Sequence, residues 1–227
     1  MSALPILVAC FAPSLAWLGY FALRGSYSPE PLHRLLLVFG GGLLAGPLSL
    51  GLFELIERAS FYGRLGSIDD VSDVTKLIYC LFAIGPIEEL SKFLALWWFL
   101  NARHIDFDDP VDGIVYAAAA ALGFATIENW YFMLAAEEPV WSRAITLPFN
   151  HVLFASFWGL GLGLARSGAS HGRRRVVTGL LLAIAYHGLY DYMTLASSVS
   201  RLWVTPLVLF LWIWLSVAIR SIHRPAS

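Results

Sequence analysis

The sequence is poor in charged residues and has almost no cysteine. Asp, Glu, Lys and Arg make up 14% of its 227 residues and hydrophobic residues 58%, against about 25% and about 45–50% in soluble globular domains. Because so little polar surface cannot cover so large an apolar core, the composition excludes a soluble fold, a disordered chain and a secreted disulfide scaffold. The net charge of −1 gives no attraction to nucleic acid. Cys10 and Cys80 lie in separate apolar runs, so we interpret them as buried apolar residues rather than as a disulfide.

Long apolar runs are what the sequence contains instead. Seven runs have about the 17–25 mostly apolar residues that a transmembrane helix needs; they are 3–23, 35–56, 76–100, 111–135, 144–165, 176–199 and 202–219. The connections are short, and the longest, 57–75, could form a helix on the membrane surface. We therefore predict an all-α, polytopic integral membrane helix bundle with about seven transmembrane helices. It would form a single membrane-embedded domain over 1–227, with its polar motifs in about 76–199.

The basic residues of the connections predict how this bundle is oriented. Nine Lys or Arg residues fall on one side of the membrane and five on the other. The positive-inside rule then places the N-terminus outside and the C-terminus in the cytoplasm of a multi-pass cell-membrane protein. Three of the nine form the run Arg173, Arg174 and Arg175, which we interpret as a cytoplasmic anchor.

Five charged residues lie well inside the predicted spans, away from the span ends, where lipid would surround them. They are joined there by two histidines, and the seven residues are Glu88, Glu89, Lys92, Glu128, His151, His187 and Asp191. Each ionised group near mid-membrane costs about 2.5–3.5 kcal/mol on insertion scales, so five cost on the order of 15 kcal/mol, comparable to the whole stability of a domain. Mutual pairing, a bound metal or a water-filled cavity must offset this cost.

The third span concentrates three of these charges. Glu88 and Lys92 are four residues apart and share one helix face, so they can neutralise each other. Glu89 lies about 100° around the helix, and an ion pair that only joined two helices would leave it unexplained. Pro86 removes one backbone donor, which predicts a kinked helix just before the two glutamates.

Three further spans carry one polar element each. Glu128 lies in the fourth span and His151 in the fifth, while His187 and Asp191 share a face of the sixth. A His and Asp pair at this spacing can bind a metal, or the Asp can orient the His ring. One polar site inside the bundle explains all four spans, and acids with histidines suit peptide hydrolysis, which needs an activated water and a stabilised oxyanion. From the depth of these residues counted from the span ends, we expect the site to open toward the outer half of the membrane.

Taken in order, these motifs resemble those of the PrsW-type intramembrane proteases, which are related to the CAAX prenyl endopeptidase superfamily. The resemblance is carried by Glu-Glu-x-x-Lys at 88–92, Asp-Pro-Val-Asp-Gly-Ile-Val-Tyr at 109–116, Gly-Phe-Ala-Thr-Ile-Glu-Asn at 123–129, His151, and His-x-x-x-Asp at 187–191. It implies a polytopic endopeptidase that cuts a single-span membrane protein, of which a membrane-anchored anti-sigma factor is the archetype.

The resemblance also implies roles for individual residues. By position, Glu88 and Glu89 match the paired glutamates of the family, and Glu128 matches the acid of its Phe-x-x-x-Glu motif. His151 and His187 match its two later histidines. Our hypothesis is that one of the paired glutamates is the general base and that Lys92 keeps the other ionised.

The use of a metal stays open at this point. Four residues are candidate ligands of one divalent ion, zinc being the first choice: Glu128, His151, His187 and Asp191. The alternative role for the same residues is proton transfer and oxyanion support. Related superfamily members have Asn or another small polar residue in place of Asp191, and a charged acceptor there fits metal binding or His orientation better than oxyanion binding. The sequence has no His-Glu-x-x-His zinc signature.

Two other classes of function would also fit parts of this pattern. A proton- or ion-coupled transporter places acids and histidines at mid-membrane as well, but the seven spans show no internal repeat. A non-catalytic scaffold could bind transmembrane helices through glycine-rich stretches such as 40–46 and 159–163. Such a scaffold would not need five intramembrane charges.

Overall fold

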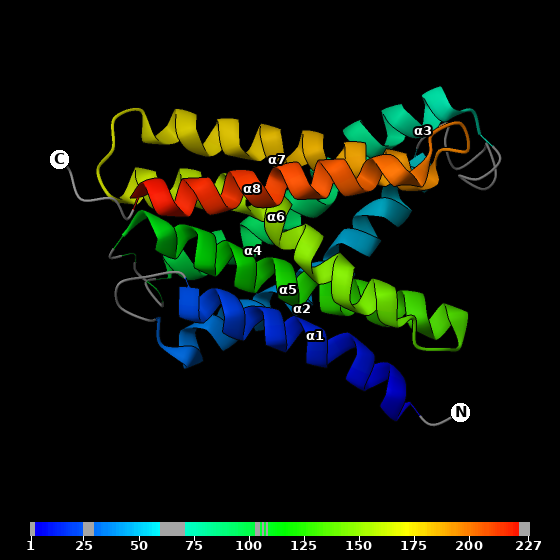
Figure 1. The fold of residues 1–227 in the computed structure, drawn as a ribbon, viewed down its shortest axis with the longest axis horizontal. Helices are drawn as coiled ribbons and strands as arrows, with labels where there is room; N and C mark the ends of the chain where they lie inside the picture. The colour runs from blue at the N-terminus through cyan, green and yellow to red at the C-terminus, as the bar shows by residue number, and fades with distance from the viewer. Residues whose placement is uncertain are drawn as a thin grey trace.

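The computed structural model of the chain describes residues 3–24, 30–59, 71–102, 105, 107 and 109–222. Within these residues the chain forms helices and no strand, as shown in Figure 1. The α-helices are α1 (Leu4–Arg24), α2 (Leu32–Ala59), α3 (Asp73–Tyr79), α4 (Gly85–Asn101), α5 (Pro110–Ala136), α6 (Trp141–Arg166), α7 (Gly172–Leu195) and α8 (Val204–Ile222). A π-helical segment, η3 (Cys80–Ile84), joins α3 to α4, and a short 3-10 helix, η4 (Arg201–Trp203), precedes α8.

The predicted all-α membrane bundle is confirmed. All seven predicted spans are helical, and five helical segments are long and apolar enough to cross a membrane; these are Leu4–Leu23, Leu32–Ile56, Pro110–Ala136, Trp141–Arg166 and Arg201–Ile222. The other two predicted spans correspond to α3–α4 and α7, which carry most of the intramembrane charges. The start of α1 and the end of α8 lie at opposite ends of the bundle (Figure 1), as an odd number of crossings requires.

Helix α5 forms the centre of the bundle, and small residues let its neighbours approach closely. The run Ala117–Ala121 is completely buried. A Cβ on Gly42 of α2 would stand 2.1 Å from the backbone oxygen of Ala120, and one on Gly159 of α6 would stand 2.6 Å from the Cβ of Ala117. These glycines therefore act in packing within the protein, since dispersion between close backbones is a main source of helix association in lipid.

The start of α5 is fixed by a capping box. Asp109 accepts a hydrogen bond from the backbone of Val111, and the side chain of Asp112 accepts one from the backbone of Asp109. Pro110 occupies the first turn, where its missing N–H has no helical partner to lose. The cap places the start of the α5 motif at one membrane end, so that Glu128 lies about five turns further along the helix.

The helix of the third span changes its winding just before the paired glutamates. Instead of a sharp kink at Pro86, the chain makes the π-helical turn η3 and continues as α4 from Gly85. A π turn inserts one extra residue per turn and commonly marks functional sites. The distortion predicted from Pro86 is therefore present, but it lies on the N-terminal side of the proline.

Two predictions about other parts of the chain can be compared with the structure. Cys10 and Cys80 are buried and unpaired, as expected from their apolar surroundings. The possible surface helix in 57–75 lies largely outside the described residues, since 60–70 are not among them.

Candidate active site in the membrane bundle

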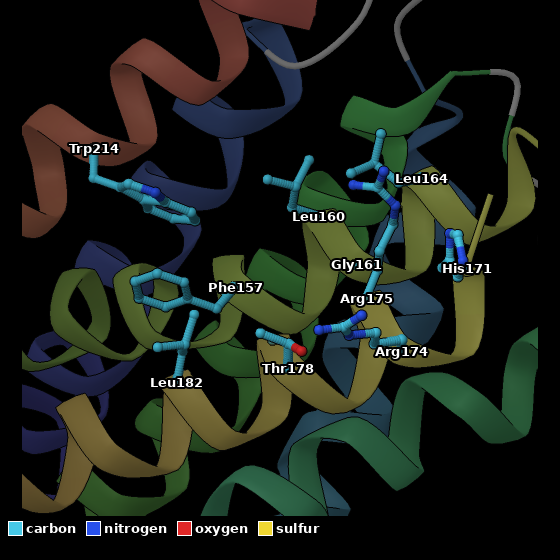
Figure 2. Close-up of a pocket in the computed structure, with 11 residues that line it drawn as sticks. Phe157, Leu160, Gly161, Leu164, His171, Arg174, Arg175, Thr178, Leu182 and Trp214 are labelled. Carbon is cyan, nitrogen blue, oxygen red and sulfur yellow. The ribbon is translucent and has the colours of Figure 1, made fainter. Parts of the chain in front are cut away.

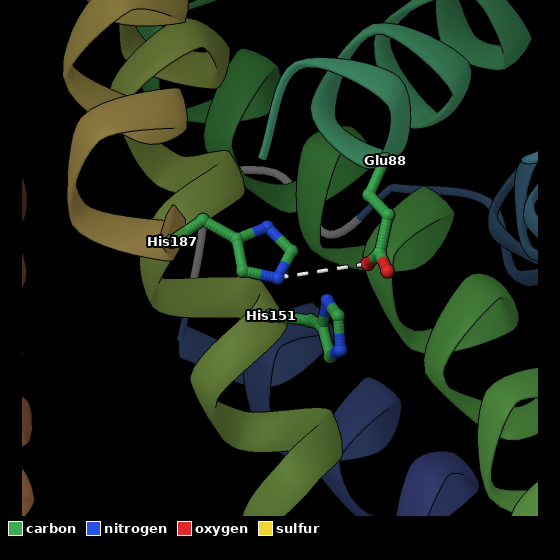
Figure 3. Close-up of side chains that lie close together, drawn as sticks. All are labelled: Glu88, His151 and His187. Atoms are coloured by element: carbon green, nitrogen blue, oxygen red, sulfur yellow. Dashed lines mark ion pairs between the residues drawn. The ribbon is translucent and has the colours of Figure 1, made fainter. Parts of the chain in front are cut away.

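Four helices bring all seven candidate residues into one connected cluster. The paired glutamates and the lysine come from α4, Glu128 from α5, His151 from α6, and His187 with Asp191 from α7. Figure 3 shows Glu88, His151 and His187 pointing toward one another, with His187 Nε2 3.5 Å from Glu88 Oε2. These three side chains are separated by up to 99 positions in the sequence, so only the packing of α4, α6 and α7 unites them.

Lys92 is the central cation of the cluster. Its side chain is fully buried, and its Nζ lies 2.8 Å from Glu89 Oε1, 2.7 Å from His151 Nδ1 and 3.6 Å from Glu88 Oε2. The same Nζ lies 4.4 Å from the centre of the Phe124 ring, a favourable position over the ring face. The pair predicted between Glu88 and Lys92 exists, but Lys92 is closer to Glu89.

Glu89 is a fixed carboxylate with three donors. Oε1 accepts from Lys92 Nζ and lies 2.8 Å from His187 Nδ1, while Oε2 accepts a 2.9 Å hydrogen bond from Trp158 Nε1. The residue is completely buried. Because its oxygens are already engaged, Glu89 is suited to orienting His187 and poorly suited to accepting a proton from water.

His187 presents its other nitrogen to two carboxylates. When Nδ1–H of the neutral ring donates to Glu89, Nε2 carries the free lone pair. Nε2 lies 3.5 Å from Glu88 Oε2 and 3.4 Å from Asp191 Oδ2. Both of these buried oxygens lack a hydrogen bond within the described residues. Three acceptors that face one another need a proton or a cation between them, because buried polar atoms are rarely left without a partner.

His151 connects the buried lysine to the edge of the cluster. Its Nδ1 faces Lys92, and its Nε2 lies 2.8 Å from Glu128 Oε2. Glu128 is paired in turn with Arg143 Nη2 at 2.6 Å, and both of these side chains are about 30% exposed. The polar cluster therefore reaches the protein surface near the turn between α5 and α6.

A close backbone contact between α7 and η3 sets the distance between the helices. A Cβ on Gly188 would stand 2.6 Å from the backbone oxygen of Cys80, and one on Gly85 would stand 2.7 Å from a backbone oxygen of α7. Real Cβ atoms essentially never come so close, so glycine at both positions allows the two backbones to touch. This contact holds His187 beside Glu88.

Three of the clustered residues have the geometry and chemistry to hold a metal ion. Glu88, His151 and His187 each offer a ligand atom, these atoms lie within 4.8 Å of one another, and all three residues are buried. Two imidazoles and one carboxylate form a donor set that suits catalytic zinc. Both histidines predicted as ligands belong to this set, whereas Glu128 and Asp191 each lie beside one histidine. The observation that fits a cation is Glu88 Oε2, which faces this set and accepts no hydrogen bond within the described residues.

Sequence reasoning missed three contacts in and beside the network. Trp158 donates to Glu89, Arg143 pairs with Glu128, and Asn150 Nδ2 donates a 2.9 Å hydrogen bond to the hydroxyl of Tyr190. Trp158 follows His151 by seven residues, which is two turns on the same helix face. That spacing could have identified it, whereas Arg143 looked like an ordinary connection residue.

Comparison with known proteins agrees with the class that this site defines. A membrane helix bundle with buried acids and histidines at its centre has the composition of an intramembrane hydrolase. The sequence profile of the PrsW family intramembrane metalloproteases matches residues 30–218. The chain therefore belongs to the PrsW family and is an intramembrane protease, as the resemblance implied.

Individual relatives cover nearly the whole chain. Protease PrsW of Geobacillus kaustophilus is 32% identical over 221 residues, covering 96% of this chain and 91% of that protein. Protease PrsW of Bacillus subtilis is 31% identical over 209 residues, covering 91% of this chain and 90% of that protein. Protease PrsW of Oceanobacillus iheyensis is 30% identical over 212 residues, covering 92% of both. No solved structure matches the chain.

Proposed function

We propose that this protein hydrolyses a peptide bond in or near the transmembrane segment of a single-span membrane protein, with Glu88 as the residue that accepts the proton of the attacking water. The observation that carries this proposal is the set of facing acceptors Glu88 Oε2, Asp191 Oδ2 and His187 Nε2, which lies inside a membrane bundle. Such a set can hold a water or a cation where lipid offers neither. Family membership supplies the reaction class.

Glu88 is the stronger candidate for the base of the two adjacent glutamates. Its Oε2 accepts no hydrogen bond within the described residues, and its side chain keeps 10% exposure where Glu89 has none. Glu88 would take a proton from water as the water attacks the scissile carbonyl, and would then return that proton to the leaving amine. Glu89 would orient His187, and Lys92 would keep Glu89 ionised.

A divalent metal, zinc being the first choice, would be held by Glu88, His151 and His187. Such an ion polarises a carbonyl and lowers the pKa of water. Glu88 has two carboxylate oxygens, so one can bind the cation while the other remains for the proton. Glu128 and Asp191, each beside one histidine, would fix the imidazole positions in the way that outer carboxylates do around metals.

The proposal extends to the substrate and to the orientation of the protein in the membrane. The resemblance of the motifs implies a substrate of the anti-sigma-factor type, anchored by one transmembrane helix. With the N-terminus outside and the C-terminus in the cytoplasm of the cell membrane, the Glu128–Arg143 pair near the α5–α6 turn would lie on the outer side. The cut would then fall in the outer half of the membrane. The bilayer is the other partner of this single embedded domain.

A cleavage assay tests this proposal directly. The purified protein is reconstituted in liposomes with a single-span anti-sigma-factor substrate that carries a tag at each end, and the products are identified by mass spectrometry. Glu88→Gln should lower the cleavage rate by about 10²–10⁴-fold, while the protein remains folded. Glu54→Gln is the matched control, because Glu54 is 64% exposed in a simple pair with Arg58. Full cleavage by Glu88→Gln would contradict the assigned base.

Measurements of the metal content of the protein and of proton flux across the liposome membrane test the metal site and the transporter alternative. One equivalent of zinc per chain, lost together with activity on chelation and recovered on adding zinc back, would support the metal set Glu88, His151 and His187. Activity that survives complete metal removal would contradict it and leave a glutamate mechanism. Proton flux in the same liposomes without any proteolysis would instead favour the transporter alternative.

A further inference from the structure

A crevice of about 460 Å³ lies at the end of the bundle where α6 ends and α7 begins, and α8 forms its third wall (Figure 2). This volume is within the range of small-molecule sites, about 300–1,000 Å³. None of the seven candidate catalytic residues lines it. It is therefore separate from the proteolytic site.

One end of the crevice is strongly basic. Figure 2 shows Arg174, Arg175 and His171 together at this end. Arg175 Nε donates a 3.1 Å hydrogen bond to the backbone oxygen of Ser170, which restrains its side chain. Neither arginine forms an ion pair within the part of the chain that the structure describes. No Asp or Glu is among the described residues that line the crevice, so this end can accept an anion.

The other end of the crevice is apolar. Phe157 of α6 and Trp214 of α8 stack there with ring centres 3.9 Å apart, and Leu182 of α7 lies beside them (Figure 2). Leu182 is seven residues, or about 10 Å, beyond Arg175 along α7. Thr178 lies between them on the same helix face. A ligand that fills the crevice must be anionic at one end and apolar over about this length.

We propose that this crevice binds an anionic phospholipid, with its phosphate against Arg174 and Arg175 and an acyl chain extending past Thr178 to Leu182 and Trp214. Basic pockets between transmembrane helices recognise anionic headgroups in this way. A free phosphate would occupy only the basic end and leave the apolar end empty. This site is more specific than the general cytoplasmic anchor expected from the arginine run, because it requires the apolar walls as well as the charge.

The position of α8 gives such a lipid a structural effect. Only 11% of the α8 span is buried in the protein, and Leu211 and Leu215 are its buried residues. In contrast, α6 and α7 touch through their backbones, since a Cβ on Gly161 would stand 2.7 Å from the backbone oxygen of Arg175. An acyl chain in the crevice would therefore add contacts between α8 and a fixed α6–α7 pair, and the bound lipid would stabilise the docking of α8.

A photo-crosslinking experiment on the full chain tests this proposal. The protein is reconstituted in nanodiscs that contain either phosphatidylglycerol or phosphatidylcholine with a diazirine in the acyl chain, and labelled peptides are identified by mass spectrometry. Phosphatidylglycerol should label the peptides around Phe157, Leu182 and Trp214, and phosphatidylcholine should not. The double variant Arg174→Gln/Arg175→Gln should bind phosphatidylglycerol about 30-fold more weakly, as expected for two arginines near a membrane surface.

Two further variants distinguish a lipid site with defined walls from general attraction of anionic lipid to positive charge. Arg166→Gln/Arg173→Gln removes the same amount of charge at the same end of the bundle. These two arginines line a different crevice, which Phe93 and Trp97 also line, so this variant should keep the labelling. Thr178→Trp keeps both crevice arginines but fills the space between them and Leu182, and it should lose the labelling while still eluting as a single folded species.

Four results would overturn the proposal. Equal labelling by the two lipids would show that the crevice does not select an anionic headgroup. Equal loss of labelling in the two double-arginine variants would show that the lipid responds to net charge and not to this crevice. Full labelling of Thr178→Trp would show that the lipid does not occupy the space between the arginines and Leu182. Complete displacement of the lipid by millimolar inorganic phosphate would show a simple anion site.

Discussion

Removing the charge of Lys92 should destabilise the whole bundle. Lys92→Met keeps a similar length but leaves Glu89 buried without a cation, because Lys92 is the only Lys or Arg within 4 Å of Glu89 among the described residues. Glu89 would retain donors from His187 and Trp158. Breaking a buried ion pair by removing one partner costs about 3–5 kcal/mol.

The cost of this change is large enough to measure as a melting temperature. For a chain of this size, each kcal/mol shifts Tm by about 2–4 °C, so the variant should melt about 6–20 °C below the unmodified protein in the same detergent. The double variant Glu89→Gln/Lys92→Met removes both charges and should recover most of the lost Tm, since replacing both partners of a buried pair is often neutral. It should remain inactive, because the glutamine no longer holds His187 as a carboxylate does.

Two outcomes would refute this reasoning. If Lys92→Met melted within 2 °C of the unmodified protein, the pair with Glu89 would not stabilise the bundle. If the double variant were less stable than Lys92→Met alone, the cost would come from lost packing around the lysine stem and not from the unpaired charge.

Three more predictions follow from single contacts. Gly188→Ala should push α7 away from η3 and lower the cleavage rate about 10²-fold, because a displacement of about 1 Å in an active site can cost that much. Gly40→Ala is the control and should leave the cleavage rate unchanged, since a Cβ there meets no atom within 4 Å. Trp158→Phe removes a donor to the Glu89 carboxylate and should cost about 1.5–3 kcal/mol in unfolding free energy, so an unchanged Tm would contradict this role. The pKa of Asp73 is lowered by its hydrogen bonds to Ser198 and neighbouring groups, so this contact contributes stability above the ordinary Asp pKa and loses it as the pH falls through the lowered value. Hydrogen-exchange protection of the Ser198 amide should therefore drop below about pH 4, and Asp73→Asn should lack this pH step.

The long helices were predictable from the sequence because the length and hydropathy of each apolar run are local properties. A run such as 111–135 has the length and hydropathy of a membrane span, and Asp109 with Pro110 is a local start signal that the structure places at the beginning of α5. The charged residues were also detectable one by one, since an ionisable side chain in an apolar run is expensive. Neither conclusion requires knowledge of how the helices pack.

The pairing within the cluster was not predictable, because it depends on distances between helices. Helical spacing alone favoured Glu88 as the partner of Lys92, but Glu89 lies closer to Lys92, and its carboxylate is also contacted by Trp158 of α6 and His187 of α7. The engagement of Glu89 by Trp158 joins α4 to α6 across 69 positions. For the same reason, the sequence favoured neither glutamate as the base, whereas the lack of a hydrogen bond to Glu88 Oε2 within the described residues supports our proposal of Glu88.

The order of the helices along the chain has a consequence for biosynthesis. Helix α4, with three charges in five residues, leaves the ribosome before the histidines of α6 and α7 that contact those charges. Until then Glu88 and Glu89 have Lys92 as their partner from the cluster, and α4, which has 17 residues, is not among the five helical segments long and apolar enough to cross a membrane by themselves. We therefore expect α4 to depend on its neighbouring helices for a stable place in the membrane, and the polar cluster is complete only when α7 has been made.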